Sequence, residues 1–219
     1  MTKDAAIDPR AFDDSRAFWE DRYSSRGTLW SGNPNPHLVS EMSDLTPGTA
    51  LDAGSGEGAD AIWLAECGWQ VTAVDFSAVA LERGVAQAAE RGAEFSRRIA
   101  WLHEDLTEWV PAEASYDLVS AQFMHLPKEP REALYRRLAA AVAPGGSLLI
   151  VAHHPSDLQT TIPRPQMPEL FFTAEDVAAL LDPHDWEIVV SEARGRDVTD
   201  PEGCTVTIHD AVLRARRHR

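Results

Sequence analysis

Residues 51–65, LDAGSGEGADAIWLA, decide the fold, because they join a buried strand to a helix through a glycine-rich turn. Gly54, Gly56 and Gly58 stand between the two elements. Glycine lets the backbone turn sharply and lets a ligand approach it closely beside the N-terminus of the following helix. The stretch therefore predicts an α/β fold whose first strand, turn and helix hold a ligand.

The segments around this stretch alternate between the two kinds of element. Strands are expected at residues 49–53, 70–76, 99–104, 116–123 and 147–153, and helices at residues 59–66, 78–91 and 130–142. The run LLIVA at residues 148–152 is apolar throughout, as is typical of a strand that is covered on both faces. This alternation predicts βαβ units in a parallel sheet.

The C-terminal part departs from that rhythm. Residues 186–191 (WEIVVS) and 205–214 (TVTIHDAVLR) have strand character without a helix between them, and the turn-rich residues 193–203 join them. They predict a hairpin, so at least one of the last strands is antiparallel. The expected fold is α/β: a Rossmann-like, seven-stranded, mostly parallel sheet flanked by helices and closed by a C-terminal antiparallel β-hairpin.

Composition limits the partners and the compartment. The 219 residues, 44% of them hydrophobic, predict a single domain, and the net charge of −15 disfavours nucleic acid and anionic membranes as partners. The two cysteines, Cys67 and Cys204, allow no disulfide framework and no CxxC metal motif, which fits a reducing cytoplasm. No signal peptide or membrane span is predicted. We expect a cytoplasmic monomer or homodimer.

Two acids near the glycine turn bear on the cofactor. Asp75 ends the second strand about 20 residues after the turn, where a carboxylate can accept both ribose hydroxyls of an adenosine cofactor. Gly54-x-Gly56-x-x-Ala59 also fits the dinucleotide pattern. Asp52, however, would face the phosphates of a dinucleotide, whereas it suits the ammonium group of S-adenosylmethionine (SAM), which has no phosphate. SAM is favoured, and an NAD-dependent oxidoreductase or a non-catalytic SAM-binding regulator remains an alternative.

DAGSGEG at residues 52–58 resembles the D/E-x-G-x-G-x-G motif of the class I SAM-dependent methyltransferases. Further motifs are similar to that family at residues 74–77 (VDFS), 103–106 (HEDL), 116–126 (YDLVSAQFMHL) and 143–150 (APGGSLLI). The resemblance covers the motifs of roughly residues 45–152. It implies methyl transfer from SAM to a small-molecule acceptor, a heteroatom or a heterocycle, with S-adenosylhomocysteine as the product.

The resemblance also implies roles for the residues around the turn. Asp52 would orient the ammonium group, and the glycines at 54, 56 and 58 would admit the methionine and ribose portions. Asp75 would bind the ribose hydroxyls.

Beyond Asp75, the resemblance implies contacts with the rest of the cofactor. Phe76, followed by Ser77, would stack on adenine, with core packing as the alternative. Asp105 would bond the adenine amino group with Leu106 beside the ring, or it caps a helix. Gln122 would lie near the methionine portion, or it is a satisfied polar group at a strand end.

Before the first strand, residues 19–34 (WEDRYSSRGTLWSGNP) resemble the N-terminal region of the thiopurine S-methyltransferase and tellurite-resistance branches. There, a Trp-bearing helix and a later aromatic residue cover SAM and border the acceptor. Trp19 and Trp30 match this pattern, with core packing as the alternative. Residues 33–36 (NPNP) are interpreted as a loop that closes over the cofactor.

The domain is expected to divide into an N-terminal helical cover (1–46), a SAM-binding core (47–154), a substrate-side loop (155–172), and a helix with the C-terminal hairpin (173–219). The loop is rich in proline, and long loops in compact domains often bind ligands, although a plain surface connection is the alternative.

Methyl transfer requires alignment and the exclusion of water, because the leaving group is already activated. A base is needed only where the acceptor arrives protonated. His125, just beyond the fourth strand, is the first candidate, and His153, at the end of the fifth strand and next to His154, is the second. A structural role is the alternative for each. No metal-binding spacing is present, and the N-terminal resemblance favours a soft nucleophile such as sulfur, or a heterocycle.

Overall fold

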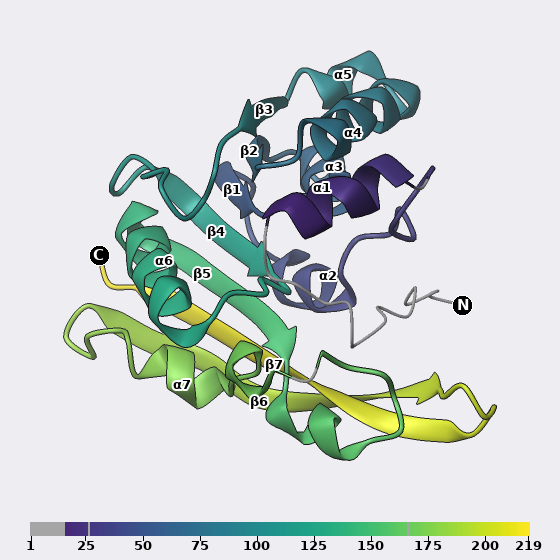
Figure 1. The fold of residues 1–219 in the computed structure, drawn as a ribbon. Helices are drawn as coiled ribbons and strands as arrows, with labels where there is room; N and C mark the ends of the chain where they lie inside the picture. Colours follow the sequence, from purple (N-terminus) through teal and green to yellow (C-terminus); the bar gives the residue numbers. More distant parts are fainter. Residues whose placement is uncertain (1–15, 26, 166) are drawn as a thin grey trace.

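The computed structural model describes residues 16–25, 27–165 and 167–219, so the first 15 residues of the expected N-terminal cover lie outside the described residues (Figure 1). The strands are β1 (Thr49–Ala53), β2 (Gln70–Asp75), β3 (Ile99–His103), β4 (Tyr116–Gln122), β5 (Val142–His153), β6 (Trp186–Thr199) and β7 (Thr205–Arg217). The α-helices are α1 (Arg16–Ser25), α2 (Pro36–Met42), α3 (Ala59–Glu66), α4 (Ala78–Arg91), α5 (Ala93–Ser96), α6 (Lys128–Ala141) and α7 (Ala174–Ala178), with 3-10 turns η1 (Pro155–Gln159) and η2 (Pro168–Leu170).

Within the described ranges, the strands form one seven-stranded sheet in the order β3-β2-β1-β4-β5-β7-β6. Strand β7 pairs antiparallel with both β5 and β6, and the other strand pairs are parallel. This confirms the expected fold class, including the antiparallel C-terminal hairpin. The order reverses between β1 and β4, and in such sheets ligands bind beyond the carboxyl ends of the strands at that point.

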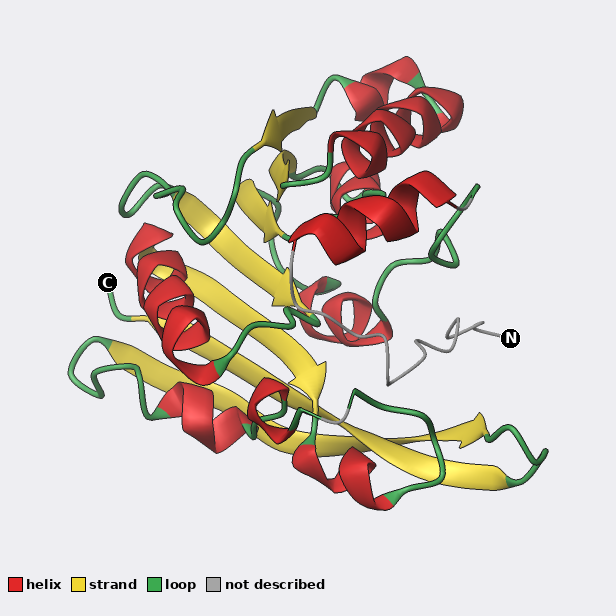
Figure 2. Cartoon of the chain, viewed as in Figure 1, coloured by secondary structure: helices red, strands yellow, loops and turns green. Residues whose placement is uncertain are grey.

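Helices cover both faces of the sheet, as the coloured elements in Figure 2 show. Successive residues of a strand face opposite sides, so β1 contributes to two separate cores. Leu51 packs in the core that contains Leu134 and Leu138 of α6. Ala50 packs in the core on the opposite face, with Leu64 of α3. The fully apolar strands expected from the sequence are thus covered on both sides.

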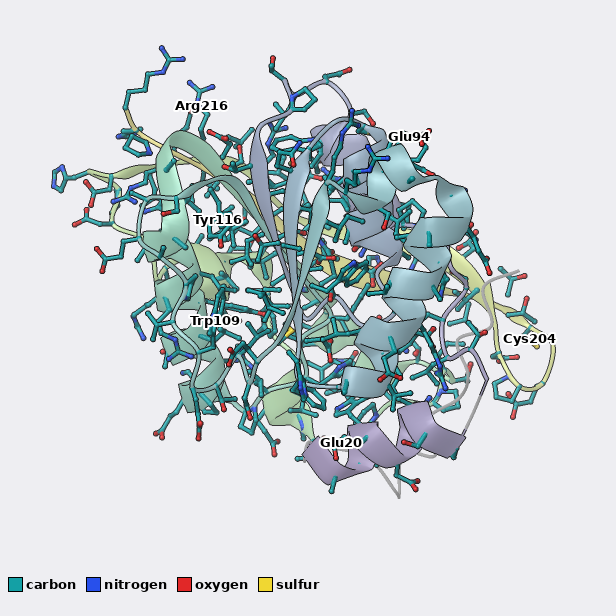
Figure 3. The ribbon with its side chains drawn as sticks, turned by 90° about the horizontal axis from the view of Figure 1, so that it is seen from above. Glu20, Glu94, Trp109, Tyr116, Cys204 and Arg216 are labelled. Atoms are coloured by element: carbon teal, nitrogen blue, oxygen red, sulfur yellow. The ribbon has the colours of Figure 1, made fainter. Side chains whose placement is uncertain are left out.

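The hairpin is longer than expected. Residues 193–199, assigned to the turn from their polar composition, belong to β6, and the chain reverses only at 200–204. Strand β6 is the outer strand of the sheet, where charged side chains are tolerated and discourage pairing with other chains. The prediction of a turn at residues 193–199 was therefore wrong, because these polar residues belong to an edge strand. Viewed from above, Cys204 lies at the tip of the hairpin, well beyond the body of the sheet (Figure 3).

Strand β5 also starts earlier than expected, at Val142 instead of Ser147. Its pairing with β4 shifts register between Tyr116 and Leu118, which accommodates the Pro-Gly-Gly turn. A side chain at Gly146 would lie 2.9–3.0 Å from three backbone carbonyl oxygens, so only glycine fits there. Helix α6 ends at Ala141, next to the expected boundary.

The N-terminal helix is present as expected: α1 carries the predicted aromatic residues and lies beside α4. In the part of the chain that the structure describes, no helix is both long enough and apolar enough to span a membrane.

Candidate active site

The glycine turn after β1 adopts the backbone conformation that its sequence predicts. Gly54, Gly56 and Gly58 have φ values of +77°, +52° and +80°, in the region that other residues rarely adopt. A side chain at Gly58 would overlap the ring of Trp101, so packing alone accounts for this glycine. A side chain at Gly54 would instead meet the sulfur of Met124 at 2.5 Å.

Asp75 holds this turn in place from the end of β2. Its Oδ2 accepts a hydrogen bond from the Gly56 amide at 2.8 Å, and its Oδ1 accepts one from the Ser77 amide at 2.9 Å. The Ser77 side chain accepts from the Ala80 amide at 3.3 Å and caps α4. Each carboxylate oxygen of Asp75 has a second lone pair that can accept a further bond.

Three buried or partly buried carboxylates surround the turn. Burial raises the pKa of Asp52 well above its ordinary value, and the charges of Asp60 and Asp75 raise it further. Burial also raises the pKa of Asp75, and it raises that of Asp60 to about 6. The Asp52 Oδ2 is buried and has no hydrogen-bond partner among the described residues. Such a cluster is unfavourable by itself and fits a cation, which the ammonium and sulfonium groups of SAM supply.

Sequence reasoning identified Asp52 and Asp75 but missed Asp60. This residue lies in the first turn of α3, two positions after the last glycine, where an acid is also typical of an ordinary helix start. Asp60 Oδ1 accepts from the Asn35 amide at 2.6 Å, and the Asn35 side-chain amide donates to Gln122 Oε1 at 2.8 Å. The loop at residues 33–36 thus contacts both the glycine turn and the end of β4.

A second missed residue, Glu57, fastens the N-terminal segment to the turn. Its buried carboxylate accepts from the backbone amides of Leu29 and Trp30 at 3.1–3.2 Å and pairs with Arg83 at 2.8 Å. Arg83 also donates to the Tyr23 carbonyl oxygen at 2.6 Å. The sequence did contain a signal for Glu57, namely a glutamate between two glycines of the predicted turn. A charged side chain is rarely buried at such a position unless it has a partner.

Aromatic rings from the N-terminal segment meet the predicted histidines. The Trp19 ring centroid lies 6.3 Å from that of Trp30 and 5.7 Å from that of His125. The His125 ring lies 5.8 Å from that of His153. Trp30 Nε1 donates to the Tyr23 hydroxyl at 3.1 Å, yet Trp30 remains 39% exposed, which favours a cover over a core residue. The structure therefore brings Trp19, Trp30, His125 and His153 into one cluster.

His153 extends this cluster toward the proline-rich loop. Its ring lies 4.6 Å from that of Phe123 and 6.3 Å from that of Phe171. We call these seven residues the aromatic cluster: Trp19, Tyr23, Trp30, Phe123, His125, His153 and Phe171. His154, the next residue, points elsewhere and bonds to Ser156.

Both histidines of the aromatic cluster are neutral at pH 7. Burial lowers the pKa of His125 to about 3, and the neighbouring His153, Arg164 and Arg22 act in the same direction. Burial likewise lowers the pKa of His153, while the carboxylate of Asp210 opposes that shift. A neutral imidazole is the form that can accept a proton.

The residues expected at the adenine end follow the carboxyl ends of β2 and β3. Asp105 Oδ1 accepts from the amide and the hydroxyl of Thr107, at 2.8 and 2.7 Å, so it caps the turn after β3. Asp105 and Trp109 line a hollow of ~230 Å³. Trp109 is labelled in Figure 3. Leu106 is buried in the core under α6. His103 Nε2 lies 2.7 Å from the Phe76 carbonyl oxygen, and the Phe76 side chain is partly exposed.

Among the described strands, β7 alone runs antiparallel to both its neighbours, and the acids at the glycine turn suit a cation and not a phosphate. Residues 50–146 match a family model described as a methyltransferase domain. This stretch is therefore a methyltransferase domain, and the chain is similar to the class I SAM-dependent methyltransferases. The dinucleotide alternative is thereby disfavoured.

Known proteins are similar to this chain at the level of sequence and of fold. The 2-heptyl-1-hydroxyquinolin-4(1H)-one methyltransferase of Mycobacteroides abscessus is 27% identical over 68% of this chain and 70% of its own length. TehB from Haemophilus influenzae superposes with a TM-score of 0.66 at 21% identity, over 91% of this chain and 67% of that one. The N-methyltransferase NodS from Bradyrhizobium japonicum, in complex with S-adenosylhomocysteine, superposes with a TM-score of 0.68 at 18% identity, over 92% and 97% of the two chains.

Proposed function

We propose that this methyltransferase transfers the methyl group of SAM to a small, planar acceptor, an aromatic or heterocyclic molecule with a nucleophilic heteroatom, held against the aromatic cluster. One contact carries this proposal. Met124 lies against Gly54 of the glycine turn, and the next residue, His125, belongs to the aromatic cluster. The proposed cofactor and acceptor subsites are therefore direct neighbours.

The cofactor subsite is built on the three carboxylates. Asp52, with Asp60 beside it, would bind the ammonium group, and Gly54 and Gly56 would border the methionine and ribose portions. Asp75 would bind the ribose hydroxyls through its remaining lone pairs. The hollow at Asp105 supports an adenine subsite there. The other members proposed for this subsite are Gly58, Phe76, Ser77, Leu106, Gln122 and the covering Trp19 and Trp30.

SAM supplies an electrophilic methyl group on a sulfonium sulfur. The chain's own residues have three tasks: to orient the acceptor, to exclude water and to take a proton where the acceptor carries one. The aromatic rings suit the first two tasks, because flat apolar surfaces bind a planar acceptor and displace water. The amide of Trp30, which donates to Glu57 of the turn, supports the proposal that the N-terminal segment, residues 1–46, is a cover over both subsites.

The acceptor class is the finer part of the proposal. The Mycobacteroides abscessus relative is named for a hydroxyquinolinone, a bicyclic heterocycle, and this supports a heteroaromatic acceptor for the present chain. Soft nucleophiles such as aromatic thiols remain candidates from the N-terminal resemblance. The substrate-side loop at residues 155–172 supplies Phe171 to the aromatic cluster, which supports its role on the acceptor side.

Cytoplasmic location and a monomeric or homodimeric state are also proposed. The two cysteines, Cys67 and Cys204, are free and exposed, which suits a reducing compartment. The net charge of −15 supports a small-molecule acceptor over a nucleic acid.

Calorimetry followed by product analysis tests the function. We expect saturable binding of SAM and S-adenosylhomocysteine, and methylated product detected by mass spectrometry from a panel that contains 2-heptyl-1-hydroxyquinolin-4(1H)-one, an aromatic thiol and an aromatic amine. NAD binding in the absence of SAM binding would overturn the proposal. SAM binding with no product from a wide acceptor panel would instead favour a SAM-binding regulator.

A further inference from the structure

His153 and Asp210 face each other across two paired strands. In the antiparallel register of β5 and β7 they are direct partners, and His153 Nδ1 lies 3.7 Å from Asp210 Oδ1. Both atoms are buried, and neither has a hydrogen-bond partner among the described residues. A donor and an acceptor that face each other at this separation need only a small side-chain adjustment to bond. The geometry therefore favours the tautomer of His153 with its proton on Nδ1.

Asp210 is itself fixed through its other oxygen. Oδ2 accepts from His37 Nε2 at 3.1 Å and from Arg196 Nε at 2.8 Å. Burial alone would raise the pKa of Asp210, but the nearby His153 and the hydrogen bond from His37 outweigh it. With the charge of Arg196, they hold this pKa well below its usual range. Asp210 is therefore an oriented anion with Oδ1 directed at His153.

The two histidines of the aromatic cluster differ in the charges around them. Among the described residues, the guanidinium groups of Arg164 and Arg22 lower the pKa of His125, while a hydrogen bond with the Phe123 backbone raises it. A proton on His125 would be repelled by both guanidinium groups.

His153, in contrast, faces two carboxylates. Asp157 Oδ2 lies 3.9 Å from its Nδ1, but that oxygen is paired with Arg164 at 2.9 Å, so its charge is largely neutralised. Asp210 has Oδ1 directed at the ring. A proton on His153 is stabilised by this carboxylate, although Arg164 and the neutral His125 ring are also near.

We propose that His153, and not His125, takes the proton of the methyl acceptor on its Nε2, and that Asp210 is the positioning residue that fixes this tautomer. The inference rests on the proposed function. The acceptor's O–H, N–H or S–H proton moves to Nε2, and the electron pair left on the heteroatom forms the bond to the methyl carbon. The carbon–sulfur bond breaks with its pair on sulfur, and His153 later releases the proton to water. Atoms and charge balance without a further reactant.

The proposal explains three features together. Asp210 is buried in a strand that otherwise contributes apolar residues to the core, His37 and Arg196 converge on one of its oxygens, and the other oxygen lies 3.7 Å from His153. Phe123, His125 and Phe171 surround the ring of His153, so its Nε2 belongs to the subsite proposed for the acceptor.

Nuclear magnetic resonance of the full chain labelled with ¹⁵N-histidine tests the tautomer without any acceptor. The chain has eight histidines, and His153→Gln assigns the signal of interest. We expect a neutral His153 with its proton on Nδ1 at pH 7.5, and a titration midpoint that falls in Asp210→Asn because the anion is lost. The control Asp197→Asn changes an exposed carboxylate of the same hairpin, bonded to Thr207, and leaves the midpoint in place. A proton on Nε2 in the wild-type chain overturns the proposal.

Kinetics with 2-heptyl-1-hydroxyquinolin-4(1H)-one give the second readout. His153→Gln is expected to lower kcat at least about 100-fold with the KM for SAM unchanged, as for loss of a general base. Asp210→Asn should lower kcat about tenfold and move the acid limb of the pH profile to lower pH, the scale of a hydrogen bond to a charged group. An unchanged acid limb would overturn the role of Asp210. If the wild-type chain gives no product, the acceptor proposal fails, whereas the tautomer measurement still decides the role of His153.

Discussion

Asp60 couples cofactor binding to pH at the scale of a single residue. Its pKa of about 6 in the free protein means that it is partly protonated near pH 6. A bound cation favours the carboxylate, so SAM lowers this pKa, and binding releases protons near pH 6 but few at pH 8. Calorimetry in buffers with different ionisation enthalpies measures this release directly. The release should be smaller in Asp60→Asn, although Asp52 and Asp75 also have raised pKa values, and equal release in that variant would remove Asp60 from the coupling.

Trp30 separates a covering role from a core role. It is 39% exposed, so Trp30→Ala should leave the melting temperature nearly unchanged while lowering turnover about tenfold or more, through poorer alignment of the acceptor. The control Trp69→Ala removes a fully buried ring and should cost about 3–5 kcal/mol of stability. A large fall in melting temperature for Trp30→Ala with normal kinetics would favour core packing.

For single residues, the sequence and the resemblance predicted members of the aromatic cluster. They did not predict the charged residues that hold these side chains in position. Trp19, Trp30, His125 and His153 were identified, because strand ends and a matching N-terminal pattern placed them near the methyl group. Glu57 and Asp210 were missed, because their partners come from remote segments. The pairing of Asp210 with His153 depends on the register between β5 and β7, which composition does not determine.

Among the elements, α1 and its following loop are fastened to the glycine turn through the ion pair of Glu57 with Arg83. Glu57→Gln removes the charge that binds Arg83 and weakens the bonds to the amides of Leu29 and Trp30. Because this side chain is buried, we expect faster amide exchange at residues 19–30 and weaker SAM binding by about 1–3 kcal/mol, with the exchange of β1 and β4 unchanged. The control Glu132→Gln alters a partly exposed pair on α6 and should change neither property. Unchanged exchange at residues 19–30 would contradict the fastening role.

The strands and helices of the central unit were predicted closely because their hydrophobic patterns are consistent along each segment. Strand β1 has the expected bounds, and β2, β3 and β4 each end one residue earlier than expected. The length of β6 was wrong because this strand lies at the edge of the sheet, where one side meets solvent and a strand can carry residues typical of turns. Local composition therefore describes covered strands better than edge strands.

For the whole molecule, function and stability oppose each other at the glycine turn. The raised pKa of Asp52 means that the folded state favours its neutral form, so its stabilising contribution is present below its unfolded pKa and is lost as the pH rises through the folded value. Above that unfolded pKa, Asp52 therefore lowers the stability of the folded chain without ligand, and a bound cation offsets this cost. This explains how a chain with a large acidic excess can keep a few buried acids for a cationic cofactor.

Asp52→Asn should accordingly raise the melting temperature of the ligand-free chain by a few degrees, because an amide avoids the charge repulsion within the cluster. SAM at about 100 times its Kd should stabilise the wild-type chain by ~2.7 kcal/mol, which is roughly 5–10 °C for a domain of this size. At the same SAM concentration the shift should be much smaller in Asp52→Asn, because the ammonium group loses its carboxylate. Differential scanning fluorimetry with SAM, S-adenosylhomocysteine and NAD measures both effects. A full SAM shift in Asp52→Asn would exclude Asp52 from the cofactor subsite, and a fall in its ligand-free melting temperature would contradict the account of strain at the turn.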